Sequence, residues 1–159
     1  MEKAGEAATK AANINISGTA VTMTNATLGA HLNGAGMTGT LTAVGSANLL
    51  KITGGSGDDS ITIVKDTKAV IEGGAGNDTL VLAAAGGFST ASISGIEVID
   101  ISGLAGNAEF KASQLSGKSF VIKGAGGDDK LQIKAGATMD ATTVDLTTLS
   151  FSDTGSETV

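Results

Sequence analysis

The chain of 159 residues is long enough for one packed domain and too short for two substantial cores. Its net charge of −6 and ten scattered basic residues argue against nucleic acid as a partner, and the absence of Cys excludes disulfides and thiolate metal sites. Trp and Tyr are also absent, and no apolar run approaches the roughly 18 residues of a membrane span. We therefore expect a core of small and branched side chains, without membrane insertion.

The N-terminal third predicts a leader followed by strands. Residues 1–12 are interpreted as a short helix or a frayed leader, and apolar and polar residues alternate from Asn13 onward and again from Thr40, which indicates strands. The dipeptide Asn33-Gly34 marks a turn. We interpret residues 1–48 as an N-terminal leader and β-strand segment, and residues 49–159 as the main β unit.

A strand-turn-strand unit occurs three times in the main β unit. Residues 50–63 read LKITGGSGDDSITI, residues 69–82 read AVIEGGAGNDTLVL, and residues 120–133 read FVIKGAGGDDKLQI. Apolar positions coincide at a spacing of two, the period of a strand with one buried face. The columns are Leu50, Ala69 and Phe120; Ile52, Ile71 and Ile122; Ile61, Leu80 and Leu131; Ile63, Leu82 and Ile133; and a polar column of Thr53, Glu72 and Lys123. Such a repeat predicts an all-β solenoid with parallel sheets, because one coil cannot bury its inner face alone.

The glycine-rich turns of the first two copies predict a cation site. Gly54, Gly55 and Gly57 permit positive φ and close backbone approach, which directs carbonyl oxygens toward a common point. Asp59 adds a carboxylate, and Asp78 occupies the equivalent position one coil later. All-oxygen, irregular coordination of this kind suits Ca²⁺ better than Mg²⁺, and zinc would prefer His or Cys.

The strings GGSGDDSIT and GGAGNDTLV match the nonapeptide G-G-x-G-x-D-x-U-x, and on these residues the chain resembles the RTX, or haemolysin-type, calcium-binding repeat proteins. The resemblance implies a right-handed parallel β-roll, flanked by irregular β structure, with Ca²⁺ held between turns by Asp side chains and main-chain carbonyls. The metal-site residues that it implies here are Gly55, Gly57, Asp58, Asp59, Gly74, Gly76, Asn77, Asp78, Gly127 and Asp129.

The sequence departs from this pattern in two places. The half-coil of residues 63–72 has no glycine turn, so we expect calcium along one edge of the roll only. The third motif has Ala125 where the second glycine belongs. Its Asp128 and Asp129 hold a separate ion, or Asp129 extends the same calcium column if the intervening β segment of about 83–118 loops out and the coil resumes; both alternatives stay open.

A second resemblance concerns residues 93–103, ISGIEVIDISG, and the Ala/Thr/Ser/Gly-rich sequence around the motifs. In this composition the chain is similar to the surface-layer proteins of Gram-negative bacteria. This resemblance implies a structural, non-enzymatic segment of a longer protein that leaves the cell by type I secretion and self-assembles into a calcium-dependent lattice on the bacterial surface. Cell-surface polysaccharide would bind through regions outside this chain. The alternatives are the export and folding module of a type I-secreted enzyme or toxin, and a segment of an adhesin.

Other polar residues offer little for catalysis. His31 is the sole imidazole, and without a second His or any Cys we expect it to be packed or on the surface. Glu97 and Asp100 would be candidates for an acid–base pair, but the alternation in IEVID places them on opposite faces. The Thr residues do not form the regular two-column array that ice binding would need.

Overall fold

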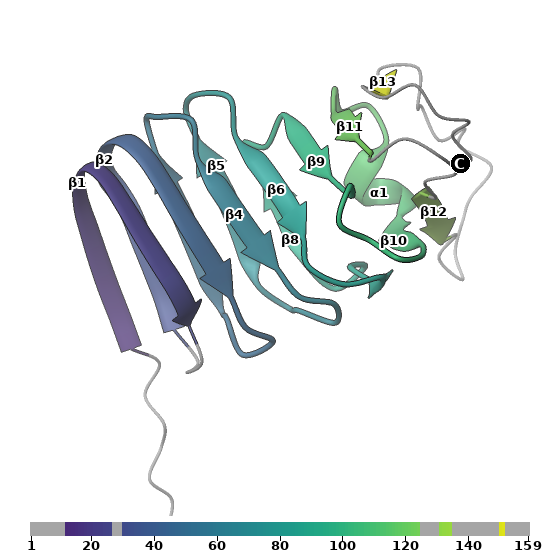
Figure 1. Ribbon diagram of the computed structural model, residues 1–159, viewed down its shortest axis with the longest axis horizontal. Helices are drawn as coiled ribbons and strands as arrows, with labels where there is room; N and C mark the ends of the chain where they lie inside the picture. Colours follow the sequence, from purple (N-terminus) through teal and green to yellow (C-terminus); the bar gives the residue numbers. More distant parts are fainter. Residues whose placement is uncertain (1–11, 27–29, 125–130, 135–149, 152–159) are drawn as a thin grey trace, which may run out of the picture.

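The computed structural model describes residues 12–26, 30–124, 131–134 and 150–151, which form a parallel β-solenoid (Figure 1). Strands of successive coils lie side by side along the long axis, from β1 (Ala12–Ala26) at one end toward β13 (Ser150–Phe151) at the other. Every pairing among the described strands is parallel. The predicted all-β parallel solenoid is therefore confirmed.

The remaining elements are short, apart from the second strand. They are β2 (Ala30–Gly45), β3 (Lys51–Gly55), β4 (Ser60–Ile63), β5 (Val70–Gly74), β6 (Thr79–Leu82), β7 (Gly86–Gly87), β8 (Ser92–Ser94), β9 (Val98–Asp100), β10 (Ala108–Lys111), α1 (Ala112–Leu115), β11 (Val121–Lys123) and β12 (Leu131–Lys134). No helix in the described ranges is long and apolar enough to cross a membrane.

The solenoid has two faces, and the long strand β2 contributes to both of them. Its first half pairs with β3 through His31–Asn33, and its second half pairs with β4 through Thr42–Val44. Strands β3, β5 and β8 continue the first face, whereas β4, β6, β9, β11 and β13 continue the second. A separate three-stranded sheet of β7, β10 and β12 lies at the end of the solenoid opposite β1 (Figure 1).

Residues at paired positions stack into two apolar ladders that form the core. The period of two in each strand places these side chains inside, and parallel register aligns them from coil to coil. Fully burying each aliphatic side chain stabilises the fold by roughly 1.5–3 kcal/mol. The first ladder consists of Ile14, Leu32, Ile52, Ile71 and Ile93, of which only Ile14 at the end of the solenoid is exposed, and the second consists of Met23, Ala43, Ile61, Leu80, Ile99 and Ile122.

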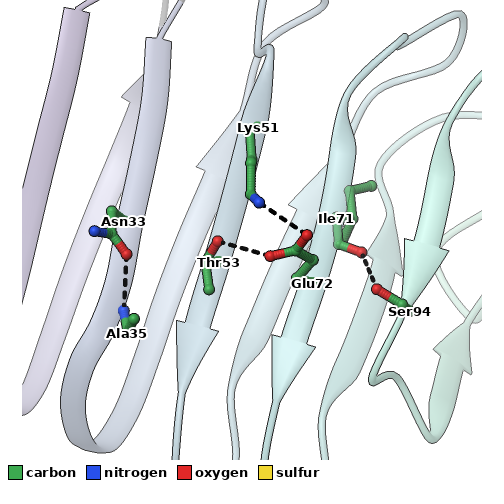
Figure 2. Close-up of polar contacts among 7 residues, drawn as sticks. All are labelled: Asn33, Ala35, Lys51, Thr53, Ile71, Glu72 and Ser94. Atoms are coloured by element: carbon green, nitrogen blue, oxygen red, sulfur yellow. Dashed lines mark hydrogen bonds and ion pairs between the residues drawn. The ribbon is translucent and has the colours of Figure 1, made fainter.

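The outer face of β3, β5 and β8 carries polar side chains such as Lys51, Thr53 and Glu72 (Figure 2). Lys51 Nζ lies 2.8 Å from Glu72 Oε1, and Thr53 Oγ1 donates to Glu72 Oε2 at 3.1 Å. Because of the hydrogen bond from Lys51, the pKa of Glu72 is lowered from 4.5. Exposed pairs of this kind add little stability, so the solenoid depends on its inner ladders.

Two aromatic rings and a buried glutamine lie in the part of the core beside β10 and α1. Phe88 and Phe110 stack with their ring centroids 5.7 Å apart. Gln114, on the single turn of helix α1, donates from Nε2 to the carbonyls of Phe88 at 3.1 Å and Ala91 at 2.7 Å. The amide is satisfied on both sides, because its Oε1 also accepts the Lys111 N–H at 2.7 Å, and this explains how it can be buried.

The third copy of the repeat lies on a different face from the one that the aligned columns predict. Its strand β11 pairs with β9, so Ile122 follows Ile99 in the second ladder and not Ile71 in the first. Residues 83–118 do not loop out as a whole, because β8 and β9 continue the two faces. The chain passes through β10 and α1 between β9 and β11, in a coil of 23 residues from Ile99 to Ile122, and so returns to the second face at the third copy.

Four smaller column assignments were also wrong. Leu131 and Ile133 pair with Ala108 and Phe110 in the separate sheet, and Lys123 pairs with Asp100. Leu50 is 45% exposed, whereas its neighbour Leu49 is buried at 1%. Leu49 points into the core because residues 46–49 form a turn, in which the Leu49 N–H donates to the Ser46 carbonyl at 3.0 Å and the strict alternation of a strand is lost.

Candidate cation site at the turn edge

The two complete motifs form turns at the same edge of the solenoid. Gly54–Asp59 leads from β3 to β4, and Gly73–Asp78 leads from β5 to β6. The Ala75 N–H donates to the Gly55 carbonyl at 3.0 Å, and the Thr79 N–H donates to the Asp59 carbonyl at 2.8 Å. The second turn therefore stacks directly on the first.

The first glycine of each motif is required by close packing between coils. A Cβ on Gly54 would overlap the Gly73 carbonyl oxygen and Oδ2 of Asp59. A Cβ on Gly73 would overlap the Gly95 carbonyl oxygen and come within 2.5 Å of Oδ2 of Asp78. The glycines thus allow main-chain oxygens and aspartate oxygens to approach the same points of the backbone.

Asp59 is a buried carboxylate that joins two coils. Asp59 is only 2% exposed. Oδ1 accepts the Leu41 N–H of the preceding coil at 2.7 Å, and Oδ2 accepts the Gly55 N–H of its own turn at 2.7 Å. Leu41 and Asp59 directly precede the paired residues Thr42 and Ser60, so Asp59 occupies a core-facing position that is aliphatic one coil earlier.

Asp78 repeats this arrangement one coil later but is left incomplete. It is fully buried, and its Oδ1 accepts the Asp59 N–H at 2.8 Å. Its Oδ2 is buried and has no hydrogen-bond partner in the described part of the chain. Burial raises the pKa of Asp78 to about 6, and the negative charges of Asp59, Glu97 and Asp58 act in the same direction, although the hydrogen bond from Asp59 opposes them.

Glu97 is a third member of this series that sequence reasoning missed as a site residue. Its Oε2 accepts the Asp78 N–H at 2.8 Å. Each of the three acids therefore accepts the main-chain N–H of the equivalent residue one coil earlier, and we call Asp59, Asp78 and Glu97 the acidic ladder. The signal was present in the sequence, because successive members are 19 residues apart.

The remaining predicted ligands at this edge line the outside of the turns. Asp58 and Asn77 are exposed, and Asp58 Oδ1 accepts the Asn77 N–H at 2.8 Å. Gly55, Gly57, Gly74 and Gly76 lie in the two stacked turns, where Gly74 and Gly76 have φ of 123° and 119°. The structure thus brings together eight of the ten residues predicted for the site.

The other two predicted residues, Gly127 and Asp129, lie outside the described residues. Strand β11, which leads toward them, pairs with β9 on the second face. The strands that lead into the two complete motifs, β3 and β5, belong to the first face.

No basic side chain neutralises the acidic ladder within the described ranges. The two ion pairs found there join Lys51 to Glu72 and Lys123 to Asp100, away from the turn edge. The same residues contain no group of three or more His, Asp or Glu side chains placed to hold a metal ion. A cation between the turns would therefore depend on the two aspartates and on main-chain carbonyls.

The donors at this edge fit a hard divalent cation. Asp78 Oδ2 is an anionic oxygen without a partner, and the glycine-rich turns supply neutral carbonyl oxygens. Each oxygen of Asp59 already accepts one N–H, so a cation would use the remaining lone pairs. Ca²⁺ tolerates irregular sets of six to eight oxygens of this kind.

The other polar candidates lie elsewhere. His31 lies on the outer face of β2, where it lines a shallow hollow of about 420 Å³ together with residues such as Asn15 and Lys51. At Asp100, burial raises the pKa, but hydrogen bonds from Ser102 and Lys123 outweigh it and leave the pKa below 3.8. Asp100 is thus held as a carboxylate, away from the acidic ladder.

Comparison of the chain with protein-family models, curated proteins and solved structures found no match. The chain is therefore described by its architecture. It is a parallel β-solenoid with an acidic ladder along one turn edge, in which the two aspartates are buried.

Proposed function

We propose that the chain is a structural segment of a secreted bacterial surface-layer protein, in which Ca²⁺ bound between stacked turns stabilises a self-assembling β-solenoid. The observation that supports this proposal most is the unpartnered, fully buried Oδ2 of Asp78. A buried carboxylate oxygen without a donor is costly, and each neighbouring ladder member adds negative charge.

Ca²⁺ would remove this cost. Asp59 and Asp78 would bind it through their side chains, and Gly55, Gly57 and Gly74 are candidates to contribute carbonyl oxygens. The bound ion would supply the positive charge that no described basic residue provides at this edge. In its absence the aspartates repel each other, so the same turns are less stable in a compartment with little free calcium.

This dependence suits a protein that folds after export. At an extracellular-type dissociation constant of roughly 10⁻⁴ to 10⁻³ M, an ion present at ten times that concentration stabilises the fold by roughly 1.4 kcal/mol per site. For a domain of this size, that corresponds to a rise in the melting temperature of roughly 3–6 °C per site. Calcium would thus favour the folded solenoid outside the cell.

The role of the solenoid in this proposal is mechanical and not catalytic. Parallel coils with continuous inner ladders form a stiff rod, and the solenoid ends present strands for association with further molecules. The sole imidazole, that of His31, lies on the outer face of β2, away from the buried acids.

Thermal unfolding in 5 mM CaCl₂, in 5 mM MgCl₂ and in EGTA tests the calcium proposal. We expect the melting temperature to rise with Ca²⁺ and to stay within about 1 °C of the EGTA value with Mg²⁺, which keeps its waters and demands a regular octahedron. A melting temperature that is the same in all three conditions would refute calcium stabilisation.

A further inference from the structure

Forty consecutive residues of this acidic chain carry no formal charge. Residues 11–50 contain no Asp, Glu, Lys or Arg, so all 16 acidic and all ten basic residues lie outside them. This uncharged segment includes both long strands, β1 and β2. The net charge of −6 is therefore carried entirely by the rest of the molecule.

Strand β1 forms the end of the solenoid within the described residues. It is 15 residues long and pairs with β2 on one edge, and no other described strand pairs with it (Figure 1). Proteins usually protect such an edge with Lys, Pro, inward charges or a very short strand. Strand β1 is long and contains neither Pro nor any charged residue, and the only irregularities along it are three register shifts in its pairing with β2.

The first inner ladder is also uncovered at this end. Leu32, Ile52 and Ile71 are at most 1% exposed, because a coil lies on each side of them. Ile14 begins the same ladder and is 37% exposed. Within the described residues, this end of the solenoid therefore presents a strand edge without a paired strand and one uncovered apolar side chain, that of Ile14.

We propose that β1 is the contact surface for a second copy of this chain, with the two β1 edges pairing to form a twofold dimer. Charge favours a copy meeting through this end, because two chains of net charge −6 repel each other elsewhere but are neutral here. A twofold contact places the same strand opposite itself, so both uncovered ladders close at once. This inference deepens the proposed function, since it names the surface through which the solenoid would associate.

Sedimentation equilibrium at micromolar concentration tests the inference with two matched substitutions. Ile14→Lys introduces a charge at the open end, whereas Val121→Lys changes a β-branched side chain that is equally exposed, at 37%, but lies on β11. We expect the wild type and Val121→Lys to have twice the chain mass of 15.5 kDa. We expect the dissociation constant of the Ile14→Lys dimer to be at least tenfold higher than that of the wild type.

Thr22→Lys provides a second test that does not disturb the core, since Thr22 is exposed on β1. It should weaken the dimer in the same way while keeping the circular dichroism spectrum of the wild type. A monomeric wild type, or a dimer that both β1 variants leave intact, would overturn the inference.

Repeating the measurement in EGTA separates this inference from the calcium proposal. A dimer that persists in EGTA with an unchanged melting temperature would support the β1 contact and refute calcium stabilisation. If the melting temperature depends on calcium but neither β1 variant changes the dimer, calcium stabilisation would be supported and the β1 contact refuted.

Discussion

The main-chain N–H of Asp59 donates to Oδ1 of Asp78 across 2.8 Å, so the carboxylate of one coil holds the backbone of the coil before it. The same bond recurs from Leu41 to Asp59 and from Asp78 to Glu97. The carboxylates of the acidic ladder thus join the coils as hydrogen-bond acceptors, and one buried oxygen, Oδ2 of Asp78, is left without a donor among the described residues.

Replacing Gly73 by Ala should destabilise the solenoid. The added Cβ would overlap the Gly95 carbonyl oxygen of the next coil, and main chain cannot move aside as a flexible side chain does. We expect Gly73→Ala to lower the free energy of unfolding by about 1–3 kcal/mol or more in urea titrations. Gly103→Ala is the matched control, because nothing lies within 4 Å of the position of its Cβ. Equal stability of the two variants would show that the coils do not pack as closely as described.

Truncating a buried side chain of the first inner ladder should lower the free energy of unfolding more than truncating an exposed neighbour. Ile71→Ala removes a fully buried side chain between Ile52 and Ile93, and we expect a loss of about 2–5 kcal/mol in the free energy of unfolding. Val70→Ala changes the adjacent residue, which is 37% exposed on the outer face. It should cost less than about 1 kcal/mol. Similar losses at both positions would contradict the assignment of the two faces.

The stability of the metal-free protein should increase as the pH falls from 7 to 5. The pKa of Asp78 is raised to about 6 in the folded state, above its ordinary value of 3.8, so the folded state binds the proton more tightly. The resulting stabilisation is complete below about pH 3.8 and is lost as the pH rises through 6. Between pH 7 and pH 5 we expect a gain of roughly 1 kcal/mol in the free energy of unfolding.

Urea titrations at pH 7, 6 and 5 in calcium-stripped buffer measure this effect. Glu72 and Asp100 do not interfere, because their pKa values are lowered and their contributions are lost only as the pH falls toward and below 4.5 and 3.8. The Asp78→Asn variant should lack the gain. Stability that falls between pH 7 and pH 5 in the wild type would show that Asp78 is not a destabilised carboxylate.

Asp78→Asn should have opposite effects with and without calcium. The amide keeps an oxygen that accepts the Asp59 N–H but removes the buried negative charge, so the metal-free protein should gain about 1–3 kcal/mol. The rise in melting temperature on adding Ca²⁺ should shrink at least by half. Asp66→Asn is the control, because Asp66 is exposed, lies away from the two motif turns, and has a φ of 62° that Asn tolerates. A loss of the calcium response in Asp66→Asn would contradict the assigned site.

The inner ladders could be predicted from the sequence because they depend on local alternation. Ile52 and Ile71, and likewise Ile61 and Leu80, align in sequence at the same 19-residue spacing at which they pair in the structure. A period of two fixes which face each residue takes, and equal coil lengths then fix the register.

The position of the third repeat copy could not be predicted in this way. Ile122 carries the same local pattern as Ile52 and Ile71, but the face on which it lies depends on how many strands form between residues 83 and 118. Strand β10 and helix α1 lengthen that coil through long-range contacts such as those of Gln114 with Phe88 and Ala91. Alternation alone carries no information about such contacts.

The sequence predicted that the two complete motifs lie at one turn edge, but it did not predict the hydrogen bonding there or the part of Glu97. The glycine and aspartate spacing identified Asp59 and Asp78 as partners in adjacent coils. It did not reveal that their carboxylates accept main-chain N–H groups, since an N–H donor leaves no trace in residue identity. Glu97 was missed because the nonapeptide pattern has no place for it, although its 19-residue spacing matches.

A crystal structure of the protein grown in millimolar CaCl₂, with an anomalous difference map, tests calcium binding at the turn edge most directly. We expect a metal peak between the Gly54–Asp59 and Gly73–Asp78 turns, bound by carboxylate oxygens of Asp59 and Asp78 and by main-chain carbonyls. An empty turn edge, with Asp59 and Asp78 bonded only to the N–H groups of Leu41, Gly55 and Asp59, would contradict it.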